Sequence, residues 1–487
     1  MRLRLRKLTL FSWNLFLALL HLNIHIIEGF FAPHSFSKTS DSRLLRPFPQ
    51  PRRIILGAGV MFSESELDTF VEWLEGQRAK ASIPNTDGPT IHVLDAGDDV
   101  DTAILFSGVM WQVLADVSTN CFGPNDCEVI IHFPGLVHLG IEVLEIFEDL
   151  IRQVKGSPLG QDGSSLPELQ RLDVTKTTVP GPAMHIRARS RSSEEQELAL
   201  LRREASLAAV PREEKCQEAV RHFVQRLVID EKACPYTKSV DIAATSLESQ
   251  GITPGPVGYK WSPCSDMIDA VSTAWQSFAD VINTPEEELS TVLLSLPAVA
   301  TLEQGHNRFL AFCELMAKSV LAYGTDQMLG LVFFHPLYDR DQVDPLDDAS
   351  YGHIPPLTWL PPMARRVGGT IAKDEDCELL ETSEDARACS NYQRRAPCLV
   401  LNVLRATQLT AATGGLSVVA LDVPHTSRSR TSSEFQGGPV VSELTSATRQ
   451  VQASGIRTYA RNAIILAQRG NENLMLDLAS ELNDVYG

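Results

Sequence analysis

The sequence lacks the motifs that identify the common nucleotide-dependent, metal-dependent and hydrolytic enzymes. It contains no Walker loop, no Rossmann glycine pattern, no HExxH and no GxSxG. Its nine cysteines never stand in CxxC spacing, which argues against both a zinc ribbon and a disulfide scaffold. The cysteine pattern therefore favours a reducing compartment, although pairing of Cys121 with Cys127, or of Cys389 with Cys398, stays open under oxidation.

Basic residues are also scarce, because 43 Lys and Arg stand against 61 Asp and Glu and give a formal net charge of −18. Nine basic and only two acidic residues fall within residues 1–53, so the remaining chain carries a net charge of −25. A body this acidic is repelled by phosphate backbones, and we expect no nucleic-acid partner. With 44% hydrophobic residues, the 487-residue chain has enough apolar material for two or three ordinary domains.

Residues 1–29 have the pattern of a secretory signal peptide. Four basic residues precede an apolar run from Leu8 to Ile27. The alternative is a retained membrane anchor, since the run approaches the roughly 20 residues that a span requires. Asn14 and His21 inside the run argue against an anchor. We therefore expect no membrane segment in the mature protein.

Residues 30–53 have the composition of a transit peptide. They begin with Phe30-Phe31-Ala32-Pro33, are rich in Ser and Arg, and contain a single acid, Asp41. A signal peptide followed directly by such a segment resembles the two-part presequences of diatoms and related algae with complex plastids. The resemblance implies import into the plastid stroma, and the alternative destination is secretion.

The rest of the chain predicts an α/β fold made of two tandem small units. Residues 54–156 form a first, degenerate unit and residues 194–487 a second one, each with the order helix, strand, helix, strand, helix, strand. Crossover connections of this kind favour parallel strand pairing. Residues 157–193 are predicted to be a linker, with Gly, Ser and Pro punctuation and alternating arginines from Arg187 to Arg191 that we interpret as a solvated connector.

The two units share short matching segments. Trp111–Val117 corresponds to Trp275–Val281, and Val129–Pro134 corresponds to Val292–Pro297. These matches predict a duplication of one α/β unit, and the alternative is a chance similarity between two ordinary units.

Two insertions are predicted in the second unit. Residues 339–394 are rich in Pro, Asp and Glu, and residues 411–450 are rich in Ser, Thr and Gly. Segments of this length without regular structure are either covers over a site or disordered. After them, the pattern from Ile456 to Val485 predicts a terminal helix or helix pair.

An unbroken apolar run from Leu329 to Phe334 predicts a strand that is covered on both faces, and it ends at His335-Pro336. Ligands of open α/β sheets bind just beyond the carboxyl ends of the strands. His335 therefore stands where a site is expected.

Four segments occur in a fixed order around this strand. They are Cys234-Pro235-Tyr236 after a helix, Phe334-His335-Pro336-Leu337-Tyr338, Arg395-Ala396-Pro397 before a predicted helix with Arg405, and Tyr459 with Arg461-Asn462. This order resembles the family known as domain of unknown function 1415, in which a helix ends in Cys-Pro-Phe, a strand ends in Phe-His-Pro-x-Tyr, Arg-Ser-Pro-Tyr-Pro opens a helix bearing an Arg, and Arg-Asn begins the last helix. The resemblance spans roughly residues 213–470. Departures from the family pattern are Cys398 and Leu399 in place of Tyr-Pro, Asn402 in place of His and Ala406 in place of Glu.

The candidate catalytic residues are Cys234, His335 and Tyr338, and the candidate ligand-binding residues are Arg395, Arg405, Arg461 and Asn462. Arginines gathered around one site suit a carboxylate or phosphate ligand. Their positive charge would also activate Cys234. Such a charge is needed there because a helix C-terminus by itself disfavours a thiolate. Each residue has a structural alternative: an inert small hydrophobe, a satisfied strand-end histidine, or a surface ion pair.

Metal binding is not indicated. Cys234 and His335 supply two ligands, whereas a zinc site takes three or four from the protein. His353, Asp339 or Asp341 would complete such a site, but their spacing does not favour it. We assign no metal and no cofactor.

The residues thus lead to two hypotheses. In the first, a plastid protein binds or acts on a small anionic compound through a site of cysteine, histidine and arginine. In the second, the protein is a non-catalytic interaction or assembly factor of the plastid, and the same residues only stabilise the fold.

Overall fold

The computed structural model describes most of the chain from residue 90 to residue 487. The larger interruptions fall at residues 97–101, 121–126, 139–141, 157–168, 178–181, most of 190–209, 300–304, 369–372, 413–417 and 427–443. All described residues belong to one structural unit that spans residues 56–487. The predicted signal peptide, the transit segment and the first predicted helix lie outside the described residues.

The first sheet has the strand order β1-β2-β4-β3. Its strands are β1 (Thr90–Asp95), β2 (Cys127–His132), β3 (Leu172–Thr177) and β4 (Ala183–Ala188). Strands β1 and β2 are parallel, and the other two pairs are antiparallel. The accompanying helices are α3 (Ala103–Asn120), the 3₁₀-helix η1 (Pro134–His138) and α4 (Glu142–Gly156).

Strands β3 and β4 correct the prediction that residues 157–193 are a linker. Both strands alternate apolar and polar residues with a period of two, as half-buried strands do. Met184 and Ile186 of β4 are buried, whereas Arg187 lies 3.9 Å from the Glu128 carboxylate on β2. The Gly, Ser and Pro residues around these short strands led to the prediction of a linker, although the strands themselves have the alternating pattern. The first unit therefore extends to Ala188.

The second sheet has the strand order β5-β6-β7-β9-β8. Its strands are β5 (Ile242–Ala243), β6 (Gly255–Trp261), β7 (Thr291–Ser295), β8 (Leu329–Phe334) and β9 (Val400–Arg405). Strands β6 and β7 are parallel, and β9 runs antiparallel to both of its neighbours. Strands β6, β7 and β8 therefore point in the same direction, and their carboxyl ends lie at one edge of the sheet.

The sheets are mixed, and the parallel pairing that crossover connections favour is found between β1 and β2 and between β6 and β7. Without β5, the second sheet repeats the order and the strand directions of the first, so that β6, β7, β8 and β9 correspond to β1, β2, β3 and β4. In each sheet the last strand of the chain enters antiparallel between its two neighbours. An antiparallel return needs no crossover, and the sequence pattern did not reveal it.

Strand β9 corrects a second prediction, because a helix was expected to carry Arg405. Residues Val400–Arg405 are rich in branched side chains, and Val400, Leu401 and Val403 are buried. Branched residues on a half-buried pleated surface favour a strand over a helix.

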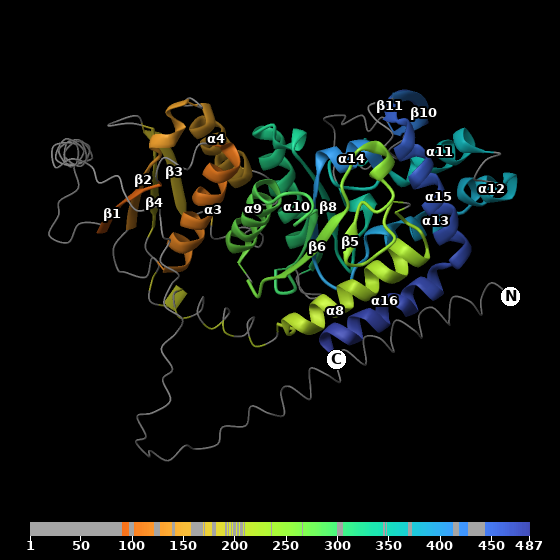
Figure 1. The fold of residues 1–487 in the computed structure, drawn as a ribbon, viewed down its shortest axis with the longest axis horizontal. Coiled ribbons are helices and arrows are strands. Elements are labelled where there is room, and N and C mark those ends of the chain that lie inside the picture. Colours follow the sequence, from red (N-terminus) through yellow and green to blue (C-terminus); the bar gives the residue numbers. More distant parts are fainter. Residues whose placement is uncertain are drawn as a thin grey trace, which may run out of the picture. The chain divides into compact units, whose positions relative to one another are not determined.

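Both faces of the second sheet are covered. Alternate residues Val292 and Leu294 of β7 pack with α9 (Met267–Asn283) and α10 (Gly305–Ala322) in one hydrophobic cluster. Leu293 faces the other way and packs in a second cluster with α8 (Glu213–Phe223), the π-helix η2 (Val224–Asp230) and α16 (Asn471–Tyr486). Figure 1 shows α8 and α16 lying along each other beneath the sheet. The predicted coverage of β8 on both faces is confirmed.

The first insertion is a folded, mostly helical segment. It contains η5 (Arg340–Gln342), η6 (Leu357–Trp359), α11 (Leu360–Val367), α12 (Asp374–Thr382), α13 (Glu384–Ala388) and η7 (Cys389–Arg394). Helices α11, α12 and α13 pack against α15 (Ala453–Arg469).

The same insertion protects the edge strand β8. The Phe333 amide donates to the Gly352 carbonyl (3.4 Å), and the Tyr351 hydroxyl donates to the Leu329 carbonyl (3.0 Å). Gly352 has φ +80°, and a Cβ there would lie 2.5 Å from the Phe333 ring, so only glycine fits this turn. Covering an edge in this way removes a template for unwanted pairing.

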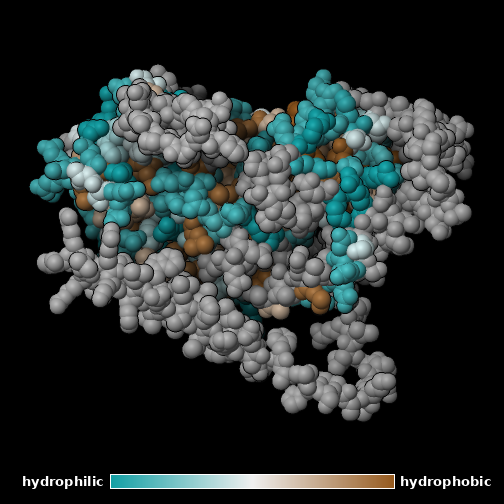
Figure 2. Space-filling model, turned by 180° about the vertical axis from the view of Figure 1, so that it is seen from behind, coloured by the Kyte–Doolittle hydropathy of each residue, from teal (hydrophilic) through white to brown (hydrophobic). Residues whose placement is uncertain are grey.

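The second predicted insertion, residues 411–450, begins at the end of α14 (Ala406–Ala412) and covers most of an antiparallel hairpin of β10 (Val418–Thr426) and β11 (Leu444–Gln452). The predicted terminal helix pair is confirmed as α15 and α16. On the face shown in Figure 2, hydrophobic residues occur in small separate areas among hydrophilic ones. Within the described part of the chain, no helix has both the length and the apolar character of a membrane span.

Candidate functional site

His335 lies directly after β8, at the edge where β6 and β7 also end. Its side chain is 0% exposed, and its amide donates to the Arg394 carbonyl (2.9 Å). The ring Nδ1 accepts a hydrogen bond from the Leu337 amide (3.1 Å). A neutral ring whose Nδ1 accepts must carry its proton on Nε2, so the backbone selects one tautomer.

A second histidine, which the sequence did not reveal, faces His335. His306 lies in the first turn of α10, and the two ring centroids are 6.1 Å apart. Phe309, one turn further on, stacks on His335 with its centroid at 4.8 Å. Burial lowers the pKa of His306; Asp339 and Gln342 oppose this shift and the Arg395 charge adds to it. His306 is therefore a neutral imidazole at pH 7.

Tyr338 and His353 form a second pair of rings in the candidate site. The His353 Nδ1 lies 3.3 Å from the Tyr338 hydroxyl, and the two rings stack at 5.8 Å. The Tyr338 oxygen also accepts from the Ile354 amide (3.4 Å). Burial raises the pKa of Tyr338 and, together with the Arg340 and Arg394 charges, lowers the pKa of His353 to about 3. Tyr338 thus keeps its proton at pH 7.

Arg340 holds the loop that carries His353. Its guanidinium is 0% exposed and donates to three main-chain carbonyls, namely those of Ile354 (2.8 Å), Val343 (2.6 Å) and Asp348 (2.5 Å). The Arg340 amide donates to the Asn391 side chain (3.0 Å). One buried side chain thereby ties Val343, Asp348 and Ile354 together.

The segment Gln393–Arg395 connects several predicted site elements. Arg394 accepts the His335 amide, and the Arg395 Nε donates to the Tyr338 carbonyl (3.1 Å). The Arg395 guanidinium also lies over the Tyr392 ring, 4.4 Å from its centroid. Gln393 accepts from the Asn462 amide nitrogen (2.9 Å).

The Cys234 loop is attached to the same segment. Asn462 donates to the Ala233 carbonyl (2.9 Å) as well as to Gln393, and Arg461 donates to the Lys232 carbonyl (3.0 Å). The half-buried Cys234 sulfur accepts from the Thr237 hydroxyl (3.4 Å). Asn462 is thus the bridge between the Cys234 loop and the segment that holds His335.

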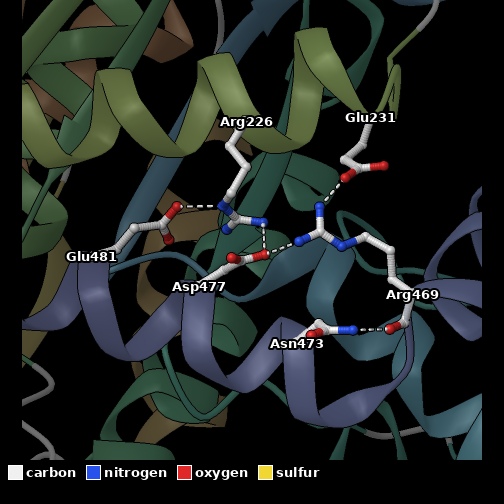
Figure 3. Close-up of polar contacts among 6 residues, drawn as sticks. All are labelled: Arg226, Glu231, Arg469, Asn473, Asp477 and Glu481. Carbon is white, nitrogen blue, oxygen red and sulfur yellow. Dashed lines mark hydrogen bonds and ion pairs between the residues drawn. The ribbon is translucent and has the colours of Figure 1, made fainter.

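An ion-pair network fixes the start of the Cys234 loop to the terminal helices (Figure 3). Arg469, at the end of α15, pairs with Glu231 and with Asp477 of α16 (2.6 Å). Arg226 of the π-helix η2 pairs with Glu481 (2.7 Å) and lies 3.8 Å from Asp477. The π-helix, which is rare and frequent at functional sites, is therefore held on both sides of its last turn.

Arg405 is not part of this group, which corrects the predicted grouping. In the register of β8 and β9, Arg405 is opposite Leu329 whereas Val400 is opposite Phe334. Five residues along a strand correspond to roughly 16 Å. The Arg405 guanidinium instead donates to the carbonyls of Thr284 (2.6 Å) and Leu289 (3.0 Å). Its role is to hold the end of α9 and the loop before β7.

The arrangement at the carboxyl edge can move protons and attract anions. Two imidazoles of which one is neutral at pH 7 can pass a proton to or from a bound compound. The amino end of the 18-residue α10 and the Arg395 guanidinium contribute positive potential beside them. No group of three His, Cys, Asp or Glu within the described residues is arranged to hold a metal ion.

Cys234 is expected to be alkylated faster than the buried cysteines. Of the eight described cysteines, only Cys127 and Cys234 are half-buried, and the other six are buried. If His335 also assists the thiolate, the His335→Ala variant should react more slowly at Cys234 and at its usual rate at Cys127. Peptide mass spectrometry after timed iodoacetamide treatment measures both rates. Modification of Cys234 only after unfolding would identify it as structural.

The neutral His353 should make stability fall in acid. Its pKa of about 3 lies below the usual 6.5, so between these values the unfolded chain takes up a proton that the folded protein refuses. The free energy of unfolding should drop by about 1.4 kcal/mol per pH unit below pH 6.5 from this residue alone. Urea titrations from pH 7 to pH 5 should show a smaller slope for His353→Gln and an unchanged slope for the exposed control His222→Gln. Equal slopes in all three proteins would contradict the assignment.

The comparisons with known proteins bear on only part of this site. No curated protein and no solved structure matches the chain. Residues 215–360 match the family described as "Protein of unknown function (DUF1415)", which confirms the predicted resemblance over this range and includes Cys234, His306, His335, Tyr338 and His353.

Proposed function

We propose that this protein binds, and acts on, a small anionic compound at the carboxyl edge of its second sheet. The observation that carries the proposal is the pair His306 and His335, with ring centroids 6.1 Å apart beside Arg395. In this proposal the imidazoles transfer protons, and the amino end of α10 and Arg395 attract the negative charge. Cys234 and Tyr338 remain the further catalytic candidates, and Arg461 and Asn462 the further binding candidates.

The burial of the site favours chemistry over surface recognition. His335 and Tyr338 are both 0% exposed, and Phe309 closes one side of the imidazole pair. Electrostatic interactions are stronger in such surroundings than in water. A ligand that enters would meet one neutral imidazole, His306, beside a cation, Arg395, which suits proton abstraction next to a carboxylate or phosphate.

A second candidate function is non-catalytic assembly, and one observation favours it. The donors of Arg461, Asn462 and Arg405 go to main-chain carbonyls, which is a structural use of these side chains. If the remaining candidate residues also have a structural role, the carboxyl edge of the second sheet only stabilises the fold. The protein would then act through its surface.

Anion titrations separate the two candidates. We expect one of two probes, inorganic phosphate or malonate, to raise the midpoint of thermal unfolding, since a ligand at 100 times its Kd stabilises by about 2.7 kcal/mol. His306→Gln should lose this shift, whereas the control His222→Gln, whose ring is exposed on α8, should keep it. The absence of a shift with either anion, or an equal shift in all three proteins, would favour the assembly function.

We further propose that the chain is imported into a plastid and that its two units arose by duplication. Residues 1–53 support the first proposal, and the shared strand order supports the second. A fusion of residues 1–60 to a fluorescent protein should enter the plastid of an alga with complex plastids, and replacement of Phe30 and Phe31 by Ala should keep it outside. Secretion of the unaltered fusion would refute plastid import.

A further inference from the structure

The two units meet through equivalent helices. Helix α3 of the first unit packs against α9 of the second, and α4 packs against α10 (Figure 1). Each of these pairs joins elements at the same place in the order strand, helix, strand, helix, strand, strand. Trp111 on α3 and Trp275 on α9 are matching positions, and both are 0% exposed.

The contact at the centre of α3 and α9 joins a residue to its own counterpart. Gln112 and Gln276 each follow the matched tryptophan, and the Gln276 Nε2 donates to the Gln112 Oε1 (2.6 Å). The same oxygen accepts from the Ser272 hydroxyl (3.1 Å), one turn before Gln276. A residue that touches its counterpart marks a two-fold axis, and a surface that pairs with itself in this way is the defining feature of a symmetric dimer interface.

We propose that the surface formed by α9 and α10 is a homotypic pairing surface whose partner is a second α/β unit of the same kind. In this chain the first unit occupies the place that a second copy of the second unit would take. The first unit is therefore an internal partner. It supplies half of a dimer-like interface, while the candidate site belongs to the second unit alone.

The proposal predicts a missing contact on the other side of the axis. The position that matches Ser272 is Gly108 on α3, so the Ser272–Gln112 bond has no mirror image. A Cβ at Gly108 would meet no atom within 4 Å, so a serine fits there without displacing a neighbour. By symmetry, the hydroxyl of the Gly108→Ser variant should donate to the Gln276 Oε1, the atom that matches the acceptor of Ser272.

A pair of double-mutant cycles in the full chain tests the two-fold relation. One cycle combines Ser272→Ala with Gln112→Ala, and the other combines Gly108→Ser with Gln276→Ala, with Gly108→Ala as the reference that carries only the gain in helix propensity. We expect both cycles to show coupling of the same sign, each about two- to tenfold in the unfolding equilibrium constant measured by urea denaturation.

The reference variant keeps the outcome clear. Gly108→Ala should stabilise the protein whether or not the proposal holds, and it shows that a side chain is accepted at this position. Coupling in the natural Ser272–Gln112 pair without coupling between the serine of Gly108→Ser and Gln276 would overturn the proposal, because the two sides of the interface would then not be equivalent.

Discussion

Replacing Trp275 by alanine is expected to lower the free energy of unfolding by about 3–5 kcal/mol. The side chain is 0% exposed and packs edge-on against Phe278 (4.9 Å) and Tyr323 (6.1 Å). Truncation removes the transfer energy of the indole and leaves a cavity that rigid helices on two sides cannot close. Urea denaturation followed by circular dichroism measures the change.

Two further tryptophans serve as a comparison and a control for this expectation. Trp111→Ala should cost a similar amount, because Trp111 occupies the matching place against Phe147 (5.4 Å) and is equally buried. Trp261, at the end of β6, is only half-buried and serves as the control with a smaller loss. A loss at Trp275 no larger than that at Trp261 would mean that the packing of Trp275 on Phe278 and Tyr323 contributes little to stability.

The elements that were predicted correctly have a hydrophobic pattern that is visible in their own short stretch of sequence. The run Leu329–Phe334 is apolar at nearly every position because helices cover both of its faces, and this signal identified β8 and placed His335 at its end. Helix α10 shows the same kind of signal through Phe309 and Phe312, since 3.6-residue periodicity is visible without tertiary knowledge.

The elements that were missed depend on distant partners. The hairpin β3–β4 consists of six-residue strands in a Gly- and Pro-rich stretch, and its pairing with β2 decides its structure. Strand β9 enters between β7 and β8 only after the connection formed by residues 335–399, so its neighbours could not be read from its own sequence. Tertiary pairing of this kind routinely overrides local propensity.

The candidate site shows the same division. The motifs singled out Cys234, His335, Arg395 and Asn462, and hydrogen bonds connect the Cys234 loop, Asn462 and the His335 amide to the segment Gln393–Arg395. His306 was missed although it follows β7, another strand that ends at the same edge; applying the rule for strand ends to β7 as well as to β8 would have found it. Arg405 was grouped wrongly because the direction of β9 was unknown.

Arg340 was invisible to the sequence, yet its removal should have the second large effect. We expect Arg340→Ala to lower the free energy of unfolding by about 3–5 kcal/mol, because three main-chain carbonyls, two of them buried, lose a charged donor and a cavity replaces the side chain. Arg340→Lys should recover only part of this loss, since an ammonium cannot reproduce the planar fork that reaches three carbonyls. Arg365→Ala is the control, because Arg365 pairs with Glu381 at the surface and such pairs contribute about 0–1 kcal/mol.

The Arg340 variants also report on the site, which a general loss of stability would not do. The guanidinium lies close enough to His353 to help depress its pKa, and it fixes the loop that buries this ring. Arg340→Lys retains a charge but loosens the loop, so water should reach His353 and its pKa should rise towards 6.5. Nuclear magnetic resonance titration of the His353 ring follows this shift directly in the folded variant. If the ring titrates as in the natural protein while stability falls, Arg340 holds the loop without controlling the environment of His353.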